Sequence, residues 1–346
     1  MSENNLNHEF LFIYDAELCN PNGDPDNENK PRMDEERGIN LISDVRLKRY
    51  IRDYLEFKGN DIYVSKVDGE TKTATERINS LFANSKATSE EKAKYEEFQK
   101  IAKKKNKNQN EKIQLKKLLN DIKKMIPNKL IDIRLFGATI PLKADEGSGS
   151  SIIYTGPLQI SWGYSLNPVK VYSFPITSQL SSESGKAQGS MGYDHRVKYS
   201  LIAFYGNIIA KKCEHTNLTE DDIKLFDEAI IKSIPLLATR SKINQFPRLY
   251  IRLAYNSDMY LYGDLRKLVK IELNDAAQKN GVKLDTIKNT LEIKLDTTEL
   301  TKIIDELKTT KLQDDKGNPT DLSTLNSDKS VFYKSNDLQI NSEIIF

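Results

Sequence analysis

The feature that most constrains the fold is the run EFLFIYD at residues 9–15, in which aromatic side chains alternate with aliphatic ones. A short apolar run of this composition, bounded by polar sequence, predicts a buried strand. The next stretch, CNPNGDPDNENKPR at residues 19–32, is crowded with Asn, Asp, Gly and Pro and predicts a long loop. We therefore expect a sheet that has this strand in its interior.

An amphipathic helix is expected from about Asp44 to Phe57, with Ser43 as its N-cap and Gly59 just beyond its C-terminus. At about 100° per residue, one arc of this helix is apolar and the opposite arc is basic. The apolar arc contains Leu47, Tyr50, Ile51, Tyr54 and Leu55, the basic arc contains Lys48, Arg49 and Arg52, and Arg46 lies at the border. We expect the apolar arc to pack on the sheet and the basic arc to face away from it.

Two antiparallel helices are expected from about Thr88 to Ile126, with a capping-box signature at Thr88 and Glu91 and an end at Pro127. Between Lys86 and Lys129 there are 14 lysines and six acidic residues, a local net charge of +8, so the rest of the chain carries −6. This segregation is typical of a protein with one surface for a polyanion and an acidic surface for a neighbour. A solvated lysine-rich helix pair explains the segment equally well.

Strands and loops dominate the rest of the sequence, with one more helix expected at about 219–233. The polar segment 167–193 is long enough to form an exposed, flexible protrusion. Residues 257–346 are mildly acidic and receive no assignment. Further strands are expected at 61–67, 196–208 and 247–255, and strands and loops at 131–142.

The element order of strand, helix, strands, helix and strand is that of a ferredoxin-like, RRM-type sheet, so the expected fold class is α+β. We expect a palm formed by residues 1–67 and 131–255, with a protruding thumb loop inserted at 165–193. Residues 68–130 would form an inserted basic helical subdomain, and 256–346 a C-terminal extension of the palm. The order alone says little about function, because this superfold carries many activities.

Several classes of protein are excluded by the sequence. No apolar run approaches the ~18 residues of a membrane span, and Cys19 and Cys213 cannot form a framework of disulfides, so we expect a cytoplasmic protein without a membrane anchor. His8, His195 and His215 are scattered singly, unlike the paired ligands of zinc. No P-loop, dinucleotide-binding glycine turn or nucleophile elbow is present. We expect neither a cofactor nor a metal.

One catalytic alternative involves Asp15, Asp24 and Asp26, which could hold magnesium against a phosphate and make the chain a metal-dependent ribonuclease. The sequence Asn-Gly-Asp-Pro is also typical of a tight turn in which Asp and Asn bond their own backbone, and we favour the turn. His195 has no evident partner for a role as general base. Catalysis therefore has little support from the residues.

Basic side chains interleaved with aromatic ones favour single-stranded RNA as the partner, because cations follow the phosphates and flat side chains contact unstacked bases. The basic arc of the helix at 44–57 could lie along such a backbone. The segments TRSKINQ and RLYIRLAY add Arg240, Lys242, Arg248 and Arg252. A solvated helix face is the alternative interpretation of the basic arc at 44–57.

Several segments together resemble one family: the backbone subunit of type I CRISPR surveillance (Cascade) complexes, of the RAMP superfamily and the "Cas-seven" type, in the variety associated with subtype I-B. They cover most of residues 8–255 in family order. The segments are FLFIYDAELCNPNGDPDNENKPR, NLISDVRLKRYIRDYL, DIRLFGATIPL, GPLQISWGYSLNPV, ITSQ followed by MGYDHRVKYSLIAFYG, and TRSKINQFPRLYIRLAY.

The resemblance implies copies that polymerise head to tail on CRISPR RNA, beside other Cascade subunits, with target DNA reached through the guide heteroduplex. It implies that the thumb of one copy forces a base out of the RNA of the next, and that the protein is not an enzyme. The residues implied at the RNA are Asn20, Asn22, Arg32, Ser43, Lys48, Arg49 and Arg52 on the palm, and Thr177, Ser178, Gln179 and Met191 on the thumb. Further candidates for RNA binding are Arg46, Arg196, Arg240, Lys242 and Arg248.

The leading hypothesis is thus a non-catalytic RNA-binding and assembly protein. A ribonuclease that uses the loop aspartates and a scaffold that assembles without nucleic acid are the alternatives.

Overall fold

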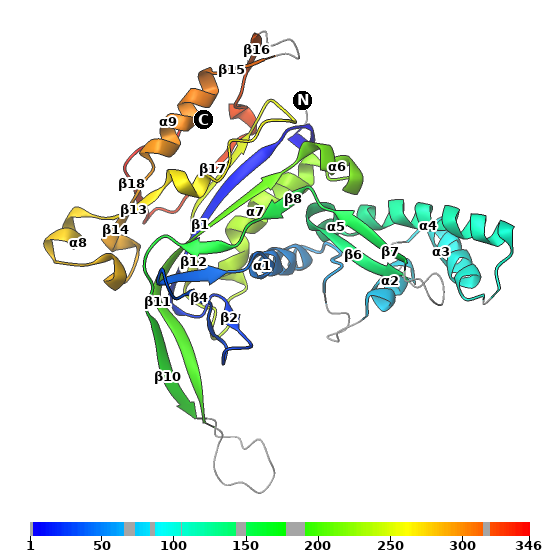
Figure 1. Cartoon of the computed structure of the whole chain (residues 1–346), viewed down its shortest axis with the longest axis horizontal. Coiled ribbons are helices and arrows are strands. Elements are labelled where there is room, and N and C mark those ends of the chain that lie inside the picture. The colour runs from blue at the N-terminus through cyan, green and yellow to red at the C-terminus, as the bar shows by residue number, and fades with distance from the viewer. Residues whose placement is uncertain are drawn as a thin grey trace, which may run out of the picture.

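The computed structural model describes residues 3–65, 73–83, 87–104, 106–142, 150–177, 191–313 and 319–346. Its centre is a large antiparallel sheet in an α+β fold, in which strand β1 pairs with β11 along one edge and with β12 along the other (Figure 1). In order, the strands are β17 (Val331–Lys334), β12 (Gln245–Ala254), β1 (His8–Cys19), β11 (Met191–Ile208), β9 (Gly163–Ser165), β5 (Ile39–Ile42) and β4 (Met33–Asp34), while β8 (Leu158–Ile160) and β10 (Val171–Thr177) also pair with β11.

Strand β1 confirms the expected buried strand, and both of its faces are covered. Phe10, Phe12 and Tyr14 belong to a core shared with helices α1 (Asp44–Phe57) and α7 (Glu220–Leu236). Leu11 and Ile13 belong to a second core on the other face. Because successive side chains of a strand point to opposite faces, burial on both sides explains the unbroken apolar run at residues 10–14.

Helix α1 begins and ends as expected. The Ser43 hydroxyl accepts a hydrogen bond from the backbone N–H of Arg46 at 3.3 Å, and Gly59 follows the last turn with φ of +87°. Helix α7 is confirmed as well, with Thr219 as its N-cap. The two helices pack on the same face of the sheet, where the Tyr54 hydroxyl donates to Glu228 of α7 at 2.8 Å.

The C-terminal region, which has no expected role from its sequence, covers the opposite face of the sheet. Leu265, Ile293 and Leu300 are among the residues that it contributes to the second core. This layer is the reason why β1 is buried on both sides. Its elements are β13 (Lys270–Leu273), α8 (Asp275–Lys279), β14 (Ile293–Asp296), α9 (Thr298–Thr309), β15 (Lys311–Gln313), β16 (Pro319–Ser323) and β18 (Gln339–Ile340).

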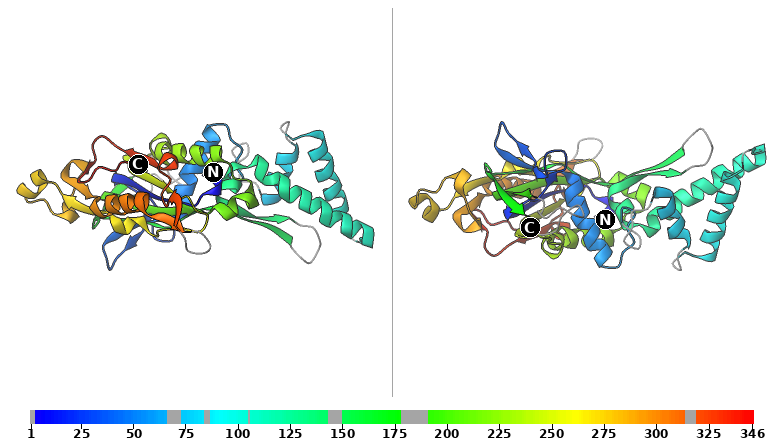
Figure 2. Two further views of the ribbon diagram at one scale, coloured as in Figure 1. Left: turned by 90° about the horizontal axis from the view of Figure 1, so that it is seen from above. Right: turned by 90° about the horizontal axis from the view of Figure 1, so that it is seen from below.

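The basic helical segment has a third core and lies at the end of the molecule opposite α8 (Figure 2). Helices α3 (Ser89–Ala102) and α4 (Gln109–Lys129) confirm the expected pair and the capping box at Thr88. The same core also takes in α2 (Ala74–Ala83), β6 (Gly137–Leu142) and β7 (Ser150–Thr155), none of which was expected there. None of the described helices is both long enough and apolar enough to cross a membrane.

Helix α4 runs through Pro127 to Lys129 instead of ending at the proline. A proline so near the last helical residue removes only one hydrogen bond, so the helix continues past it. Helix α6 (Ala210–Thr216), after β11, was not expected either.

One strand prediction is wrong, and the prediction of strands and loops at 131–142 is confirmed only for its second half. Residues 61–65 form an irregular segment, while 66 and 67 lie outside the described residues. The backbone N–H groups of Tyr63 and Val64 donate to the Asp132 carboxylate, at 2.7 and 3.2 Å, instead of to a neighbouring strand. Ile131–Phe136 forms the short helix α5, which carries Asp132, and the strand β6 begins only after it.

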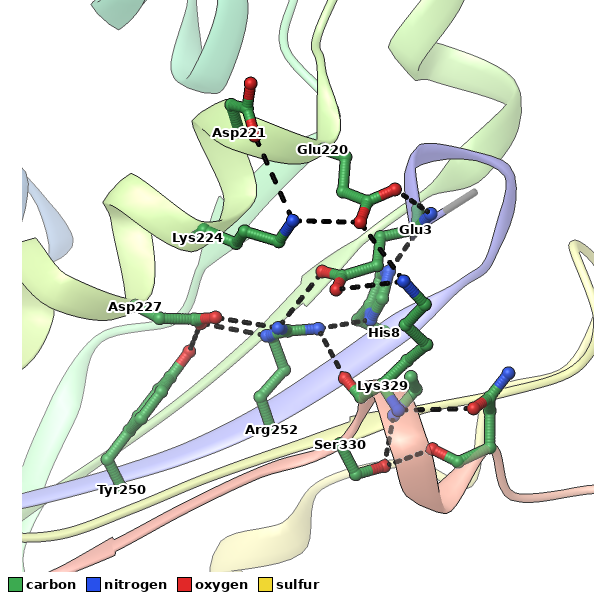
Figure 3. Close-up of polar contacts among 12 residues, drawn as sticks. Glu3, His8, Glu220, Asp221, Lys224, Asp227, Tyr250, Arg252, Lys329 and Ser330 are labelled. Carbon is green, nitrogen blue, oxygen red and sulfur yellow. Dashed lines mark hydrogen bonds and ion pairs between the residues drawn. The ribbon is translucent and has the colours of Figure 1, made fainter. Parts of the chain in front are cut away.

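Arg252 is 1% exposed, so it is not one of the surface cations available to RNA, although the sequence analysis groups it with them. Its guanidinium donates from Nε and Nη2 to the two carboxylate oxygens of Asp227 at 2.8 and 2.7 Å (Figure 3). It also contacts His8 Nδ1 at 2.9 Å and Glu3 at 3.3 Å. These bonds join the N-terminus, β1, β12 and α7, and so fix α7 against the sheet.

Candidate nucleic-acid interface

Two cations from distant parts of the sequence meet at the N-terminus of α1. The guanidinium of Arg46 lies 3.9 Å from the centroid of the Tyr50 ring. Gln245 donates to the Tyr50 hydroxyl at 3.2 Å and to the backbone oxygen of Lys242 at 2.7 Å, and the Lys242 ammonium donates to the backbone oxygen of Asn20. We refer to Asn20, Arg46, Lys242 and Gln245 as the Arg46–Lys242 site.

Neither cation of this site forms an ion pair with a carboxylate in the part of the chain that the structure describes. Burial and, second, the positive charge of Arg46 lower the pKa of Lys242 to about 8. An anion bound between the two cations would relieve their repulsion and favour the charged form of Lys242. The site therefore has the electrostatics of an anion-binding site.

Several buried polar atoms in and beside this site have no hydrogen-bond partner among the described residues. They comprise two acceptors, Asn20 Oδ1 and Gln245 Oε1, and two donors, Arg46 Nε and Asn22 Nδ2. Buried polar groups in folded proteins are nearly always paired, so such a cluster is expected to be completed by a ligand. A phosphate would accept from the donors, and a ribose hydroxyl can donate to the acceptors.

The loop at 19–32 brings three of the candidate residues together. It contains a short hairpin of β2 (Gly23–Asp24) and β3 (Lys30–Pro31). The Asn20 amide donates to the backbone oxygen of Asn29 at 2.7 Å. The backbone N–H of Arg32 donates to the backbone oxygen of Asn22 at 3.2 Å. The Arg32 guanidinium pairs with Asp24 at 3.0 Å.

Arg196 and Arg240 flank the site and share one carboxylate, that of Asp194, at 2.9 and 3.0 Å. Arg196 also donates to the backbone oxygen of Leu18 at 2.7 Å. Because the backbone N–H of Asn20 donates to Ser241 at 2.8 Å, this pair of arginines lies beside the loop at 19–32. Asp194 offsets part of their charge.

The basic arc of α1 is less exposed than expected, because α5 lies over it. The cationic groups of Lys48 and Arg52 lie 5.6 and 5.1 Å from the centroid of the Phe136 ring. Lys48 pairs with Asp44 at 2.9 Å and Arg52 with Asp132 at 3.0 Å. Their side chains are only 13% and 12% exposed, so two cations of the arc that was expected to follow an RNA backbone are largely covered.

Arg49 is the exposed member of the arc. Its side chain is 41% exposed and pairs with Asp53 one turn away. Ser43 caps the helix and so uses its hydroxyl as an acceptor for Arg46. Contact of these residues with RNA stays a prediction.

The loop aspartates of the ribonuclease alternative are held separately. Asp15 pairs with Arg248 at 2.8 Å, and Arg248 also contacts Asp337 at 2.5 Å. The Asp24 side chain accepts from the backbone N–H of Asp26 at 3.3 Å, a bond typical of the turn that we favoured. Within the described ranges, no three His, Cys, Asp or Glu side chains group closely enough to hold a metal ion.

The expected protrusion is a long two-stranded hairpin, in which β10 pairs with the first part of β11 (Figure 1). Thr177 and Met191 pair with each other at the far end of the described strands, while Ser178 and Gln179 lie outside the described residues. Tyr172 and Phe174 are exposed, and their rings contact each other edge to face with 6.0 Å between the ring centroids. The hairpin thus presents aromatic side chains to solvent.

Comparison with known proteins identifies the family. The family model for CRISPR-associated protein Cas7 matches residues 6–296. This chain belongs to the Cas7 family. A Cas7 protein of Haloferax volcanii is 30% identical over 314 residues, which cover 86% of this chain and 83% of that protein. These matches confirm the family to which the segments between residues 8 and 255 point.

Two solved structures are more distant. One, titled CRISPR RNA-guided surveillance complex, pre-nicking, has 13% identity and a TM-score of 0.46, with 75% of this chain and 83% of that chain covered. Another, titled CRISPR RNA-guided surveillance complex, has 13% identity and a TM-score of 0.41, with 84% and 89% covered. At such TM-scores the likenesses do not bear on individual residues.

The structure of this Cas7 chain also reveals surfaces that the sequence analysis did not single out. Trp162, between β8 and β9, is 48% exposed. A run of exposed lysines on α4 makes no ion pair with the described residues, namely Lys112, Lys116, Lys117, Lys123 and Lys124. The spacing of those lysines in the sequence carries this signal, but their exposure depends on how α4 packs.

Proposed function

We propose that this Cas7-family chain is a non-catalytic CRISPR RNA-binding backbone subunit of a type I-B Cascade complex, acting in the cytoplasm. Its copies would assemble head to tail along the guide RNA, beside other Cascade subunits. Family membership supports a CRISPR role, and the resemblance of the segments between residues 8 and 255 to type I-B backbone subunits supports the subtype.

The Arg46–Lys242 site carries this proposal. Its two cations have no carboxylate partner in the described part of the chain, and they lie among buried donors and acceptors that lack partners. A ribose-phosphate backbone offers both a negative charge and a hydroxyl that can donate and accept. Because phosphate and ribose are the same at every nucleotide, binding through them suits a guide whose base sequence varies.

We further propose that the sheet is a ferredoxin-like palm formed by residues 1–67 and 131–255. The strand order β12, β1, β11, β9, with α1 and α7 on one face, supports this assignment. The separate core around α3 and α4 supports an inserted helical subdomain at 68–130. The second core supports residues 256–346 as an extension of the palm.

The hairpin of β10 and β11 supports a thumb at 165–193 that reaches a neighbouring copy. Exposed aromatic residues such as Tyr172 and Phe174 favour a partner surface over solvent.

The exposed lysines of α4 support contact of the same subunit with target DNA, since unpaired cations on one helix favour a phosphate backbone.

The test is to purify the chain from cells and measure the ratio of absorbance at 260 nm to that at 280 nm. We expect an excess at 260 nm from bound RNA. Affinity for short RNAs should fall with salt, with a log-log slope of ~0.7 per phosphate contact, and scrambled sequences should bind equally well. Protein free of nucleic acid that has no affinity for RNA at low ionic strength would contradict the proposal.

A pair of variants tests the site itself. Arg46→Ala combined with Lys242→Ala should reduce RNA affinity and lower the salt slope, because two phosphate contacts are lost. Lys232→Ala is the matched control, since Lys232 is an exposed cation of α7 that pairs with Glu228. Equal RNA affinity in the double variant and the control would mean that RNA binds elsewhere.

A further inference from the structure

Trp162 is the only tryptophan of the chain, and its backbone is fixed while its side chain is half-exposed. Its carbonyl accepts hydrogen bonds from the guanidinium of Arg266 at 2.7 Å and from the hydroxyl of Ser161 at 3.3 Å. Arg266 is held in turn by both carboxylate oxygens of Asp264, at 2.8 and 2.7 Å. An indole that is 48% exposed on an anchored backbone is a preorganised flat surface.

Trp162 lines a pocket of about 340 Å³. The other lining residues come from the loop that carries β2 and β3, from β4 and β5 with the turn between them, and from the first residue of β10. The polar lining consists of Asp24, Asn27, Lys30, Arg32 and Glu35, and the apolar lining of Pro31, Met33, Leu41, Val171 and Trp162. The pocket thus lies where the palm loop meets the base of the hairpin.

The charges of the pocket distinguish between the parts of a nucleotide. Arg32 is paired with Asp24 at 3.0 Å, and Lys30 with Glu28 at 3.0 Å, so the two cations are already neutralised. A phosphate gains little from such a wall. A nucleobase is neutral, has donors and acceptors on its edges for the amide and ion-paired groups, and has a flat face for the indole.

We propose that Trp162 stacks on an unpaired base of the bound RNA, with the base seated in this pocket. This inference rests on the proposed RNA-binding function. The loop of the pocket is continuous with the Arg46–Lys242 site, because the backbone N–H of Arg32 donates to Asn22 and Asn20 belongs to that site. One strand of RNA can therefore contact both. A second copy of the chain suits the surface less well, since polar and charged groups line half of it.

A single tryptophan makes the test direct. The full-length chain, freed of endogenous RNA, is titrated with oligoadenylate and with an oligonucleotide of equal length that has abasic riboses, while tryptophan emission and RNA anisotropy are recorded together. Stacking predicts strong quenching by oligoadenylate and little quenching by the abasic chain. RNA that binds without any change in emission overturns the proposal and leaves the RNA-binding function standing. No binding of either RNA at low salt overturns both.

Variants supply the second measurement. Trp162→Ala should weaken binding of oligoadenylate roughly 5- to 100-fold and leave binding of the abasic chain unchanged, whereas Trp162→Phe should stay within about threefold of the parent. Phe57→Ala is the matched control, because Phe57 is a highly exposed aromatic residue outside the pocket. Comparable affinity of Trp162→Ala and Phe57→Ala for oligoadenylate overturns the proposal. So does an indole that becomes protected only as protein concentration rises without RNA, since that result assigns the surface to a second copy.

Discussion

The guanidinium of Arg52 and the carboxylate of Asp132 form an ion pair of 3.0 Å between helices α1 and α5, and their side chains are only 12% and 1% exposed. Asp132 also accepts two backbone hydrogen bonds from the segment after α1. Arg52 is therefore part of the packing between α1 and α5. Charge reversal of the whole basic arc of α1 would disturb the fold as well as any RNA contact.

Truncation of Arg52 should destabilise the protein. We expect Arg52→Ala to lower the free energy of unfolding by about 3 kcal/mol, because it leaves the buried carboxylate of Asp132 without its counter-charge. The matched control is Arg49→Ala, whose exposed pair with Asp53 should cost less than about 1 kcal/mol. Urea titration followed by circular dichroism measures both, and equal losses would contradict a structural role for Arg52.

RNA affinity should depend on pH through Lys242. Because its pKa in the free protein is about 8, binding of a phosphate takes up a proton above that pH. We expect affinity for oligoadenylate to be constant below pH 7 and to fall about tenfold between pH 7 and 9. Anisotropy titrations at several pH values measure this fall. Lys242→Arg, which stays charged, should abolish it, and a fall that persists in this variant would exclude Lys242 as its source.

Stability should decrease in mild acid through His8. Burial and, second, the charge of Arg252 lower the pKa of His8 to about 3, whereas the unfolded chain binds a proton near pH 6.5. The contribution of neutral His8 is thus present above pH 6.5 and is lost as the pH falls below it. From this group alone we expect a loss of about 2 kcal/mol between pH 7 and 5. His8→Gln should remove this loss when urea unfolding is compared at the two pH values.

Asp15 should act in the opposite direction. Burial raises the pKa of this carboxyl to about 6 despite its pair with Arg248. The folded state therefore binds a proton more readily than the unfolded state, and stability from this group increases as the pH falls from 6 towards 4. Asp15→Asn should make the loss of stability in acid steeper than in the parent, whereas a shallower loss would contradict the raised pKa.

Assembly on RNA should depend on the aromatic face of the hairpin. Tyr172→Ser combined with Phe174→Ser removes exposed side chains, so the free energy of unfolding should change by less than about 1 kcal/mol. We expect fewer copies per guide RNA, because the variant removes the face proposed to meet a neighbouring copy. Analytical ultracentrifugation on a long guide counts the copies, with Leu291→Ala at an exposed C-terminal position as the control. Full occupancy in the double variant would argue against a role of this face in assembly.

The sequence by itself determined the elements whose patterns are local. The apolar run of β1, the cap of α1 at Ser43, the capping box at Thr88 and the helix α7 are each specified by neighbouring residues, since period, caps and turn residues act over a few positions. The segments between residues 8 and 255 also determined the family.

Only the tertiary structure decided what the charged residues do. Arg248 and Arg252 lie on the same strand, β12, yet Arg252 is buried against Asp227, a carboxylate of a helix that no local pattern connects with it. The exposure of Lys48 and Arg52 depended on α5, a helix read as strand and loop. Arg46 meets Lys242 because α1 and the loop before β12 pack at the same end of the sheet. Such contacts join residues far apart in the chain, and a long-range contact follows from how the elements pack and not from the residues beside it.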